Sequence, residues 1–120
     1  MPNKIKIGLA DDHVLLRDAL ATLIDGFGNC QVIVKASNGE ELIKAMQNGQ
    51  VPDVLILDLN MPKISGWEVA TWVQEHQPEI RVLMLTMYDS ELSLIRLLQA
   101  GVKGFLKKDI HPDELKQAIQ

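Results

Sequence analysis

The sequence predicts an α/β fold in which a five-stranded parallel sheet carries helices on both faces. The first observation is the continuous apolar run 54–57, which is typical of a strand buried on both sides. The second is that short apolar runs alternate five times with segments of helical spacing, and the connections between them are short. Strands connected in this way run parallel through right-handed crossovers, so the sheet lies between two helical layers.

Each element is predicted from its own residues, in chain order. Strands are indicated by apolar and β-branched runs, and helices by apolar residues at intervals of three and four. Glycine and proline separate the elements. The expected strands are 5–10, 31–36, 54–58, 82–86 and 104–106, and the expected helices are 13–24, 40–47, 65–76, 91–100 and 112–119.

The composition is that of one ordinary globular domain. The chain has 120 residues, of which 47% are hydrophobic and 23% charged, and its net charge of −4 argues against nucleic acid binding through a basic surface. Cys30 is the only cysteine, so no internal disulfide can form. No segment has the length of a membrane span or the pattern of a signal peptide, so we expect a cytoplasmic protein without membrane association.

Polar residues follow four of the five predicted strands. Asp11 and Asp12 follow the first strand, Asp58 ends the third, Thr86 ends the fourth and Lys108 follows the fifth. Because parallel strands point the same way, their ends gather along one edge of the sheet, where ligands of α/β proteins bind. We therefore expect these five side chains to form one site.

This set of residue types suits phosphoryl transfer. Neighbouring carboxylates repel one another, and a hard divalent cation such as Mg²⁺ relieves the repulsion. Lys108 and Thr86 can hold phosphoryl oxygens, and Asp58 can form an acyl phosphate. Taken singly, Asp58 could be a turn former, Asp12 a helix cap, Thr86 a strand end and Lys108 a surface charge. Their joint occurrence at strand ends favours the site.

At these positions the chain resembles the receiver domain of two-component response regulators, over essentially its whole length, 1–120. The resemblance implies a flavodoxin-like (βα)5 receiver fold with strand order 2-1-3-4-5. The motifs that carry it are Ala10-Asp11-Asp12-His13, Leu57-Asp58-Leu59-Asn60-Met61-Pro62 with Gly66, Leu85-Thr86, Gly101-Val102-Lys103-Gly104-Phe105, and Lys108.

The resemblance also implies a role for each matching acidic residue. Asp58 would accept a phosphoryl group from a phosphohistidine of a sensor histidine kinase. Asp12, Asp58 and the backbone carbonyl of Asn60 would coordinate Mg²⁺, with Mn²⁺ as an alternative ion. Asp11 would act on the ion through water.

The remaining motifs imply a switch. Lys108 would pair with the phosphate, and Thr86 would bond a phosphoryl oxygen. Thr86 and Phe105 would then move together and reshape the surface of the fourth helix, fifth strand and fifth helix. Phosphorylation supplies the charge and acceptor oxygens that favour one packing over another.

Three positions depart from the pattern of the family. Phe105 lacks the hydroxyl of the more frequent tyrosine. Met87 follows Thr86 where many receivers have a small residue, and its side chain could shield the phosphate. Lys108-Asp109 replaces Lys-Pro, so we expect a trans bond there, because a cis bond before a non-proline residue costs about 2.5–4 kcal/mol.

Lys108-Asp109 also resembles the branch whose receivers precede a carboxyl-terminal helix-turn-helix of LuxR/NarL type. No such domain follows here, which favours an excised receiver over a stand-alone one. DNA would then be bound only through the missing domain, and the function would be control of transcription. Phosphorylation could produce a homodimer, for which the apolar residues of 88–98 are one candidate surface; a broad buried helix face would give the same pattern.

Other functions predict other residues. A stand-alone receiver would act through protein–protein interaction. A phosphohydrolase of the haloacid dehalogenase type would have a second aspartate where Asn60 stands, and a flavin-binding module would have a hydroxyl-rich loop where Asp11 and Asp12 would repel the phosphate. We therefore expect a signalling domain and not an enzyme, beyond slow self-phosphorylation from small donors and slow autodephosphorylation.

Overall fold

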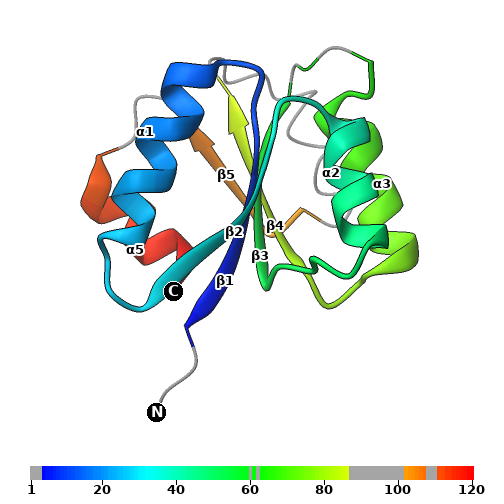
Figure 1. Cartoon of the computed structure of the whole chain (residues 1–120). Coiled ribbons are helices and arrows are strands. Elements are labelled where there is room, and N and C mark those ends of the chain that lie inside the picture. The colour runs from blue at the N-terminus through cyan, green and yellow to red at the C-terminus, as the bar shows by residue number, and fades with distance from the viewer. Residues whose placement is uncertain (1–3, 60, 62, 87–101, 108–110) are drawn as a thin grey trace.

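The computed structural model describes residues 4–59, 61, 63–86, 102–107 and 111–120, and for Thr86, Phe105 and Lys107 it describes the backbone only. Five strands form one parallel sheet, as the sequence predicts, in the order β2-β1-β3-β4-β5 that the family resemblance implies (Figure 1). The strands are β1 (Ile5–Ala10), β2 (Cys30–Ala36), β3 (Val54–Asp58), β4 (Arg81–Thr86) and β5 (Gly104–Lys107).

Helices cover both faces of the sheet. Of the helices in the described residues, two pack on one face and two on the other, which gives the three layers seen in Figure 1. Within the described residues, the first face carries α1 (Val14–Asp25) and α5 (Pro112–Ile119), and the second carries α2 (Gly39–Gln47) and α3 (Gly66–His76). The helix expected at 91–100 lies outside the described residues.

The central strand explains the continuous apolar run. Val54 and Ile56 point into the core beneath α1 and α5, whereas Leu55 and Leu57 point into the core beneath α2 and α3. All four are buried. A strand with a helical layer on each side has no solvent face, so it needs apolar residues at every position.

The starts of α2 and α5 follow from the residue types found there. Asn38 is the N-cap of α2, and its side chain accepts a hydrogen bond from the backbone N–H of Glu41 at 2.9 Å. Pro112 occupies the first turn of α5, where its missing N–H costs nothing. Among the described helices, none is long and apolar enough to cross a membrane.

The strand register brings the strand ends together. Ala10 is paired with both Ala36 and Leu57, Asp58 with Leu85, and Thr86 with Lys107. The carboxyl ends of all five strands therefore meet at the same edge of the sheet.

Candidate functional site

Asp11 and Asp58 lie on neighbouring strands at this edge. Asp11 directly follows β1, and its backbone N–H donates to the carbonyl oxygen of Ala36 at 3.0 Å. Asp58 is the last residue of β3, and only 2% of it is exposed. Asp58 belongs to the sheet and Asp11 is hydrogen-bonded to it, so the backbones that carry the two buried carboxylates are held at this edge.

Asp12 completes a cluster of three carboxylates. One ligand atom each from Asp11, Asp12, His13 and Asp58 lies within 4.8 Å of the others. The sequence prediction that the three aspartates converge is therefore confirmed. The alternative of Asp12 as a helix cap is wrong, because His13 is the N-cap of α1.

His13 is the member of this cluster to which sequence reasoning gives no role. Its Nδ1 lies 2.8 Å from Asp11 Oδ1, 3.5 Å from Asp12 Oδ1 and 3.8 Å from Asp58 Oδ2. Its backbone N–H donates to the same Asp11 Oδ1 at 2.8 Å. The signal in the sequence is its place directly after the aspartate pair, where the chain turns from strand to helix.

Arg17 is a second residue that sequence reasoning missed. Its Nη1 donates to Ser37 Oγ at 2.6 Å and lies 3.5 Å from the backbone carbonyl oxygen of Asp11. Ser37 follows β2, so this contact joins α1 to the turn before α2. Arg17 thus places a positive charge near the backbone of Asp11.

Several predicted site features fall where the structure gives no description. Asn60, Met87, Lys108, the Lys108-Asp109 bond and the apolar segment 88–98 lie outside the described residues. Thr86 ends β4 as expected, and Phe105 lies in β5, but only their backbones are described. Their roles stay predictions.

The described donor set fits Mg²⁺. Three carboxylates provide hard oxygen ligands, which this ion prefers, and one or two of them usually suffice because Mg²⁺ keeps several waters. Cys30, a soft ligand, is buried elsewhere in the fold. His13 is the one nitrogen donor in the cluster of described residues.

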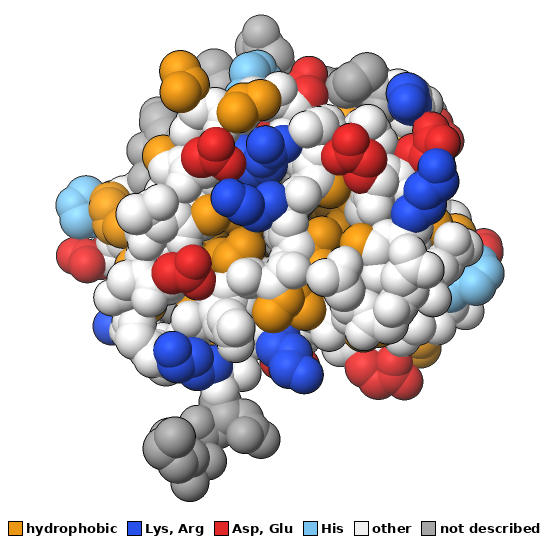
Figure 2. Space-filling view, viewed as in Figure 1, with side chains coloured by type: hydrophobic (Ala, Val, Ile, Leu, Met, Phe, Trp, Pro, Cys, Tyr) orange, Lys and Arg blue, Asp and Glu red, His pale blue; other side chains and the backbone are white. Residues whose placement is uncertain are grey.

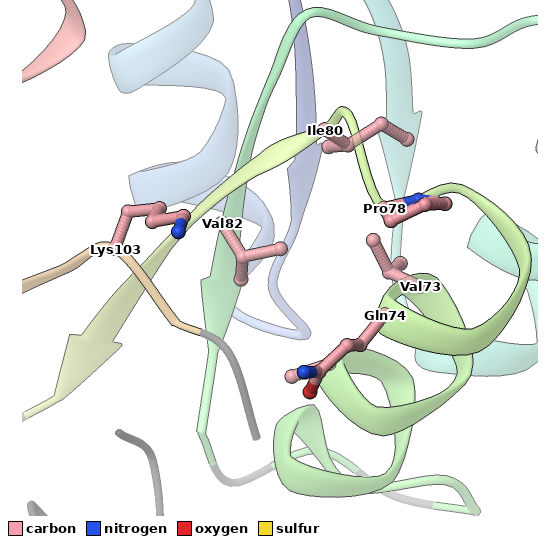
Figure 3. A pocket seen from close by; sticks show the side chains of 7 residues that line it. Val73, Gln74, Pro78, Ile80, Val82 and Lys103 are labelled. Atoms are coloured by element: carbon pink, nitrogen blue, oxygen red, sulfur yellow. The ribbon is translucent and has the colours of Figure 1, made fainter. Parts of the chain in front are cut away.

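A second concave region lies away from this edge. Figure 3 shows a pocket beside the start of β4, between α3 and the segment that leads into β5. Its lining is mainly apolar, with Gln74 and Lys103 as the polar side chains. It has no carboxylate, histidine or thiol, so we do not assign chemistry to it.

The molecular surface in Figure 2 carries basic and acidic side chains interspersed over the visible face. No continuous basic area covers that face, which agrees with the net charge of −4. Three carboxylates gather in the aspartate cluster of the described residues.

Comparisons with known proteins agree with this geometry. The chain matches the family model of the response regulator receiver domain over residues 7–120. It is 37% identical to a nitrate/nitrite response regulator protein homolog of Haemophilus influenzae, over 100% of this chain and 57% of that protein. It is 30% identical to the transcriptional regulatory protein DegU of Brevibacillus brevis, over 98% of this chain and 50% of that protein.

A solved structure gives the same result. The signal receiver domain of a response regulator named NarL, from Mycobacterium tuberculosis, superposes with a TM-score of 0.88 at 34% identity. That match covers 98% of this chain and 94% of the solved one. The chain spans about half the length of the curated relatives it matches. The fold, the acidic cluster and these matches together show that this chain belongs to the response regulator receiver domain family.

Proposed function

We propose that this domain is a phosphorylation-dependent switch of a two-component system, with Asp58 as the phosphoacceptor. The observation that carries the proposal is the convergence of Asp11, Asp12 and Asp58 at the carboxyl edge of the sheet. Receiver domains generally bind Mg²⁺ at an acidic cluster of this kind and interact with sensor histidine kinases. They are signalling domains, so turnover of a substrate is not their function.

The transfer step needs one nucleophile and a means of neutralising charge. A carboxylate oxygen of Asp58 forms a bond to phosphorus as the bond from phosphorus to the donor's histidine nitrogen breaks, and that imidazole leaves with the electron pair. In the proposal, Asp12, Asp58 and the Asn60 carbonyl would hold Mg²⁺, and Asp11 would act on it through water. When bound, Mg²⁺ would neutralise the negative charge on the phosphoryl oxygens. Lys108 and Thr86 hold the remaining oxygens.

The surface beside the site suits a protein donor. Val14 and Leu15 in the first turn of α1 are 51% and 88% exposed, and they are the large hydrophobic residues most exposed among those described. They directly follow Asp12 and His13 in the chain. We propose that this turn contacts the sensor kinase, because an apolar contact here would bring the donor histidine to Asp58.

The proposed response to phosphorylation is argued from the named functions of similar proteins and from two predicted side-chain movements. A phosphoryl group adds a charge of about −1.5 to −2 and three acceptor oxygens. Thr86 and Phe105 would respond to it and change the surface around β5 and α5, with a homodimer as the expected product. Because relatives twice as long are named transcriptional regulators, the controlled process would be transcription, through a DNA-binding part beyond this chain.

The test is the intact mass of the protein after incubation with acetyl phosphate, with and without Mg²⁺. We expect one added phosphoryl group that requires Mg²⁺ and is absent in Asp58→Asn. Asp113→Asn is the matched control, since Asp113 is an exposed aspartate on α5, outside the cluster. Absence of any adduct, with trapping of short-lived phosphate also negative, would contradict the proposal and favour a phosphorylation-independent interaction domain.

A further inference from the structure

We propose that His13 sets the metal selectivity of this site: its imidazole opposes binding of Mg²⁺ and becomes a ligand for borderline cations such as Co²⁺. The inference rests on the proposed function, because it concerns the same cluster. It assigns a role to the cluster member that the phosphoryl transfer does not use.

The geometry places the imidazole across the mouth of the cluster. Its Nδ1 lies within 4 Å of a carboxylate oxygen from each of the three aspartates, at 2.8 Å, 3.5 Å and 3.8 Å. Asp11 and Asp58 are buried, whereas 61% of the His13 side chain is exposed. The ring therefore lies on the solvent side of the two buried carboxylates.

The side chain is not committed to the helix that His13 begins. An N-cap side chain commonly accepts a hydrogen bond from a backbone N–H of the first turn. His13 is the N-cap of α1 but makes no such bond, and the imidazole turns back to Asp11 instead. A structural explanation of His13 as a helix cap therefore does not account for its orientation.

Competition with Mg²⁺ follows from the hydrogen bond to Asp11. An ionised carboxylate can only accept, so Nδ1 is the donor in the 2.8 Å contact. A cation that uses Asp11 Oδ1, directly or through a bound water, has to replace this contact. Mg²⁺ gains nothing from the ring in return, because it prefers oxygen ligands.

Borderline cations have a compensating bond available. In the neutral ring with its proton on Nδ1, the other nitrogen Nε2 carries a lone pair. The ring can turn at the exposed mouth without entering the core. Co²⁺ and Zn²⁺ accept imidazole together with carboxylates, so for them a nitrogen–metal bond offsets the lost hydrogen bond. The same residue thus acts in opposite directions on the two classes of ion.

Isothermal titration calorimetry with Mg²⁺ and with Co²⁺ tests this directly on the untagged chain and on His13→Phe, which keeps a ring but has no nitrogen. We expect the Mg²⁺ dissociation constant to fall about tenfold, which corresponds to the lower end of the range for one hydrogen bond to a charged group. The Co²⁺ dissociation constant should rise about tenfold. The visible spectrum of bound Co²⁺ should also change, because it depends on the ligands.

His76→Phe is the matched control. His76 is an exposed histidine at the end of α3, where it stacks on Trp72, and it belongs to no acidic cluster of the described residues. Both dissociation constants should equal those of the wild type. His13→Asn is the second variant, and circular dichroism checks that each variant is folded.

The opposite signs make the outcomes distinct. If the two constants move in the same direction, or neither moves, His13 has only a structural role and the inference is wrong. If the wild type binds neither ion, the metal site fails, and with it the Mg²⁺ requirement of the proposed function. Binding of both ions with an unchanged ratio in His13→Phe leaves the proposed function intact and removes this inference alone.

Discussion

Gly66 packs directly against the backbone of Asp58. A Cβ atom at Gly66 would lie 2.3 Å from the Asp58 carbonyl oxygen and 3.0 Å from Leu59 Cα. The N–H of Gly66 donates to the carbonyl oxygen of Leu59 at 3.0 Å. The first residue of α3 thus holds the end of β3 in place, and no side chain fits between them.

Gly66→Ala should therefore damage the site as well as the fold. The new methyl group has to push the Asp58 backbone away, and overpacking of this kind costs about 1–3 kcal/mol. We expect lower stability in urea unfolding and weaker Mg²⁺ binding measured by calorimetry. The displaced backbone belongs to the proposed phosphoacceptor, so phosphorylation by acetyl phosphate should fall too.

Gly49→Ala is the control for this substitution. Gly49 has φ 95°, so alanine is strained there by about 1 kcal/mol, but a Cβ would meet no atom within 4 Å. Its stability should drop while Mg²⁺ binding stays at the wild-type value. Equal Mg²⁺ binding in the two variants would show that the Gly66 contact does not position Asp58.

Gly66 also shows how far the sequence reaches. As a residue type it predicts a turn after Pro62, and that much follows from its conformational freedom. The reason no other residue fits is a contact with Asp58, eight positions earlier, and that contact exists only after α3 has folded back over β3. Local patterns do not contain such distances.

The acidic cluster was predictable for a different reason. Asp11 and Asp58 are far apart in the chain, but each ends a recognisable apolar run, and a parallel sheet brings strand ends together. The strand order and direction were therefore enough to predict that the two carboxylates meet, without any side-chain geometry. The turn of His13 toward Asp11 and the reach of Arg17 to Ser37 depend on side-chain orientation, which strand and helix periodicity does not specify.

Lys63 has a backbone conformation that lysine rarely adopts. Its φ is 67°, in the left-handed region, which costs a residue with a Cβ about 1–2 kcal/mol. Lys63→Gly removes this steric cost. Only part of it appears as added stability, because glycine loses more conformational entropy on folding than lysine does. We expect a net stabilisation of about 0.5–1 kcal/mol in urea unfolding.

Two further variants separate the backbone from the charge. Lys63 Nζ lies 3.7 Å from Glu40 Oε2, and an exposed pair of this kind contributes little. Lys63→Gln should therefore unfold within about 0.5 kcal/mol of the wild type. Lys63→Val should be clearly less stable, since a β-branched side chain tolerates positive φ poorly. A glycine variant no more stable than the glutamine variant would refute the strain at this position.

Cys30 gives the fold a predictable response to alkaline pH. Burial raises the pKa of the Cys30 thiol; Lys116 lowers it and Asp25 raises it further, but burial is the largest cause. In the unfolded chain the thiol ionises at its ordinary pKa, below the folded value. The contribution of the protonated Cys30 thiol to the free energy of unfolding is therefore complete below the thiol's pKa in the unfolded chain. It is lost as pH rises through the thiol's pKa in the folded protein.

The free energy of unfolding should fall more steeply above the ordinary thiol pKa in the wild type than in Cys30→Ala. Urea titrations at a series of pH values from neutral to alkaline measure both slopes. All other groups titrate alike in the two proteins, so the difference in slope isolates the thiol. Parallel slopes would mean that the thiol ionises equally well in the folded protein.

Arg81 joins the start of β4 to the end of α5. Its Nη1 donates to the carbonyl oxygen of Ile119 at 3.1 Å, and its Nη2 to that of Ala118 at 3.0 Å. The last carbonyls of a helix have no partner within the helix, and a positive charge at this end is favourable. One guanidinium at the start of β4 thus satisfies two carbonyl acceptors at the end of α5.

Arg81→Met should cost about 1–3 kcal/mol in urea unfolding, because both bonds involve a charged donor. Arg81→Lys should recover only part of that loss, since an ammonium group cannot donate in the parallel geometry of the guanidinium. Lys35→Met controls for the loss of an exposed charge: Lys35 pairs with Asp18 at 3.6 Å, and its removal should cost less than about 1 kcal/mol. Amide hydrogen exchange gives the local readout. If Arg81 acts as inferred, amide exchange in Arg81→Met accelerates more in α5 than in α1. Equal acceleration in both helices would mean that Arg81 stabilises the domain as a whole and not the end of α5.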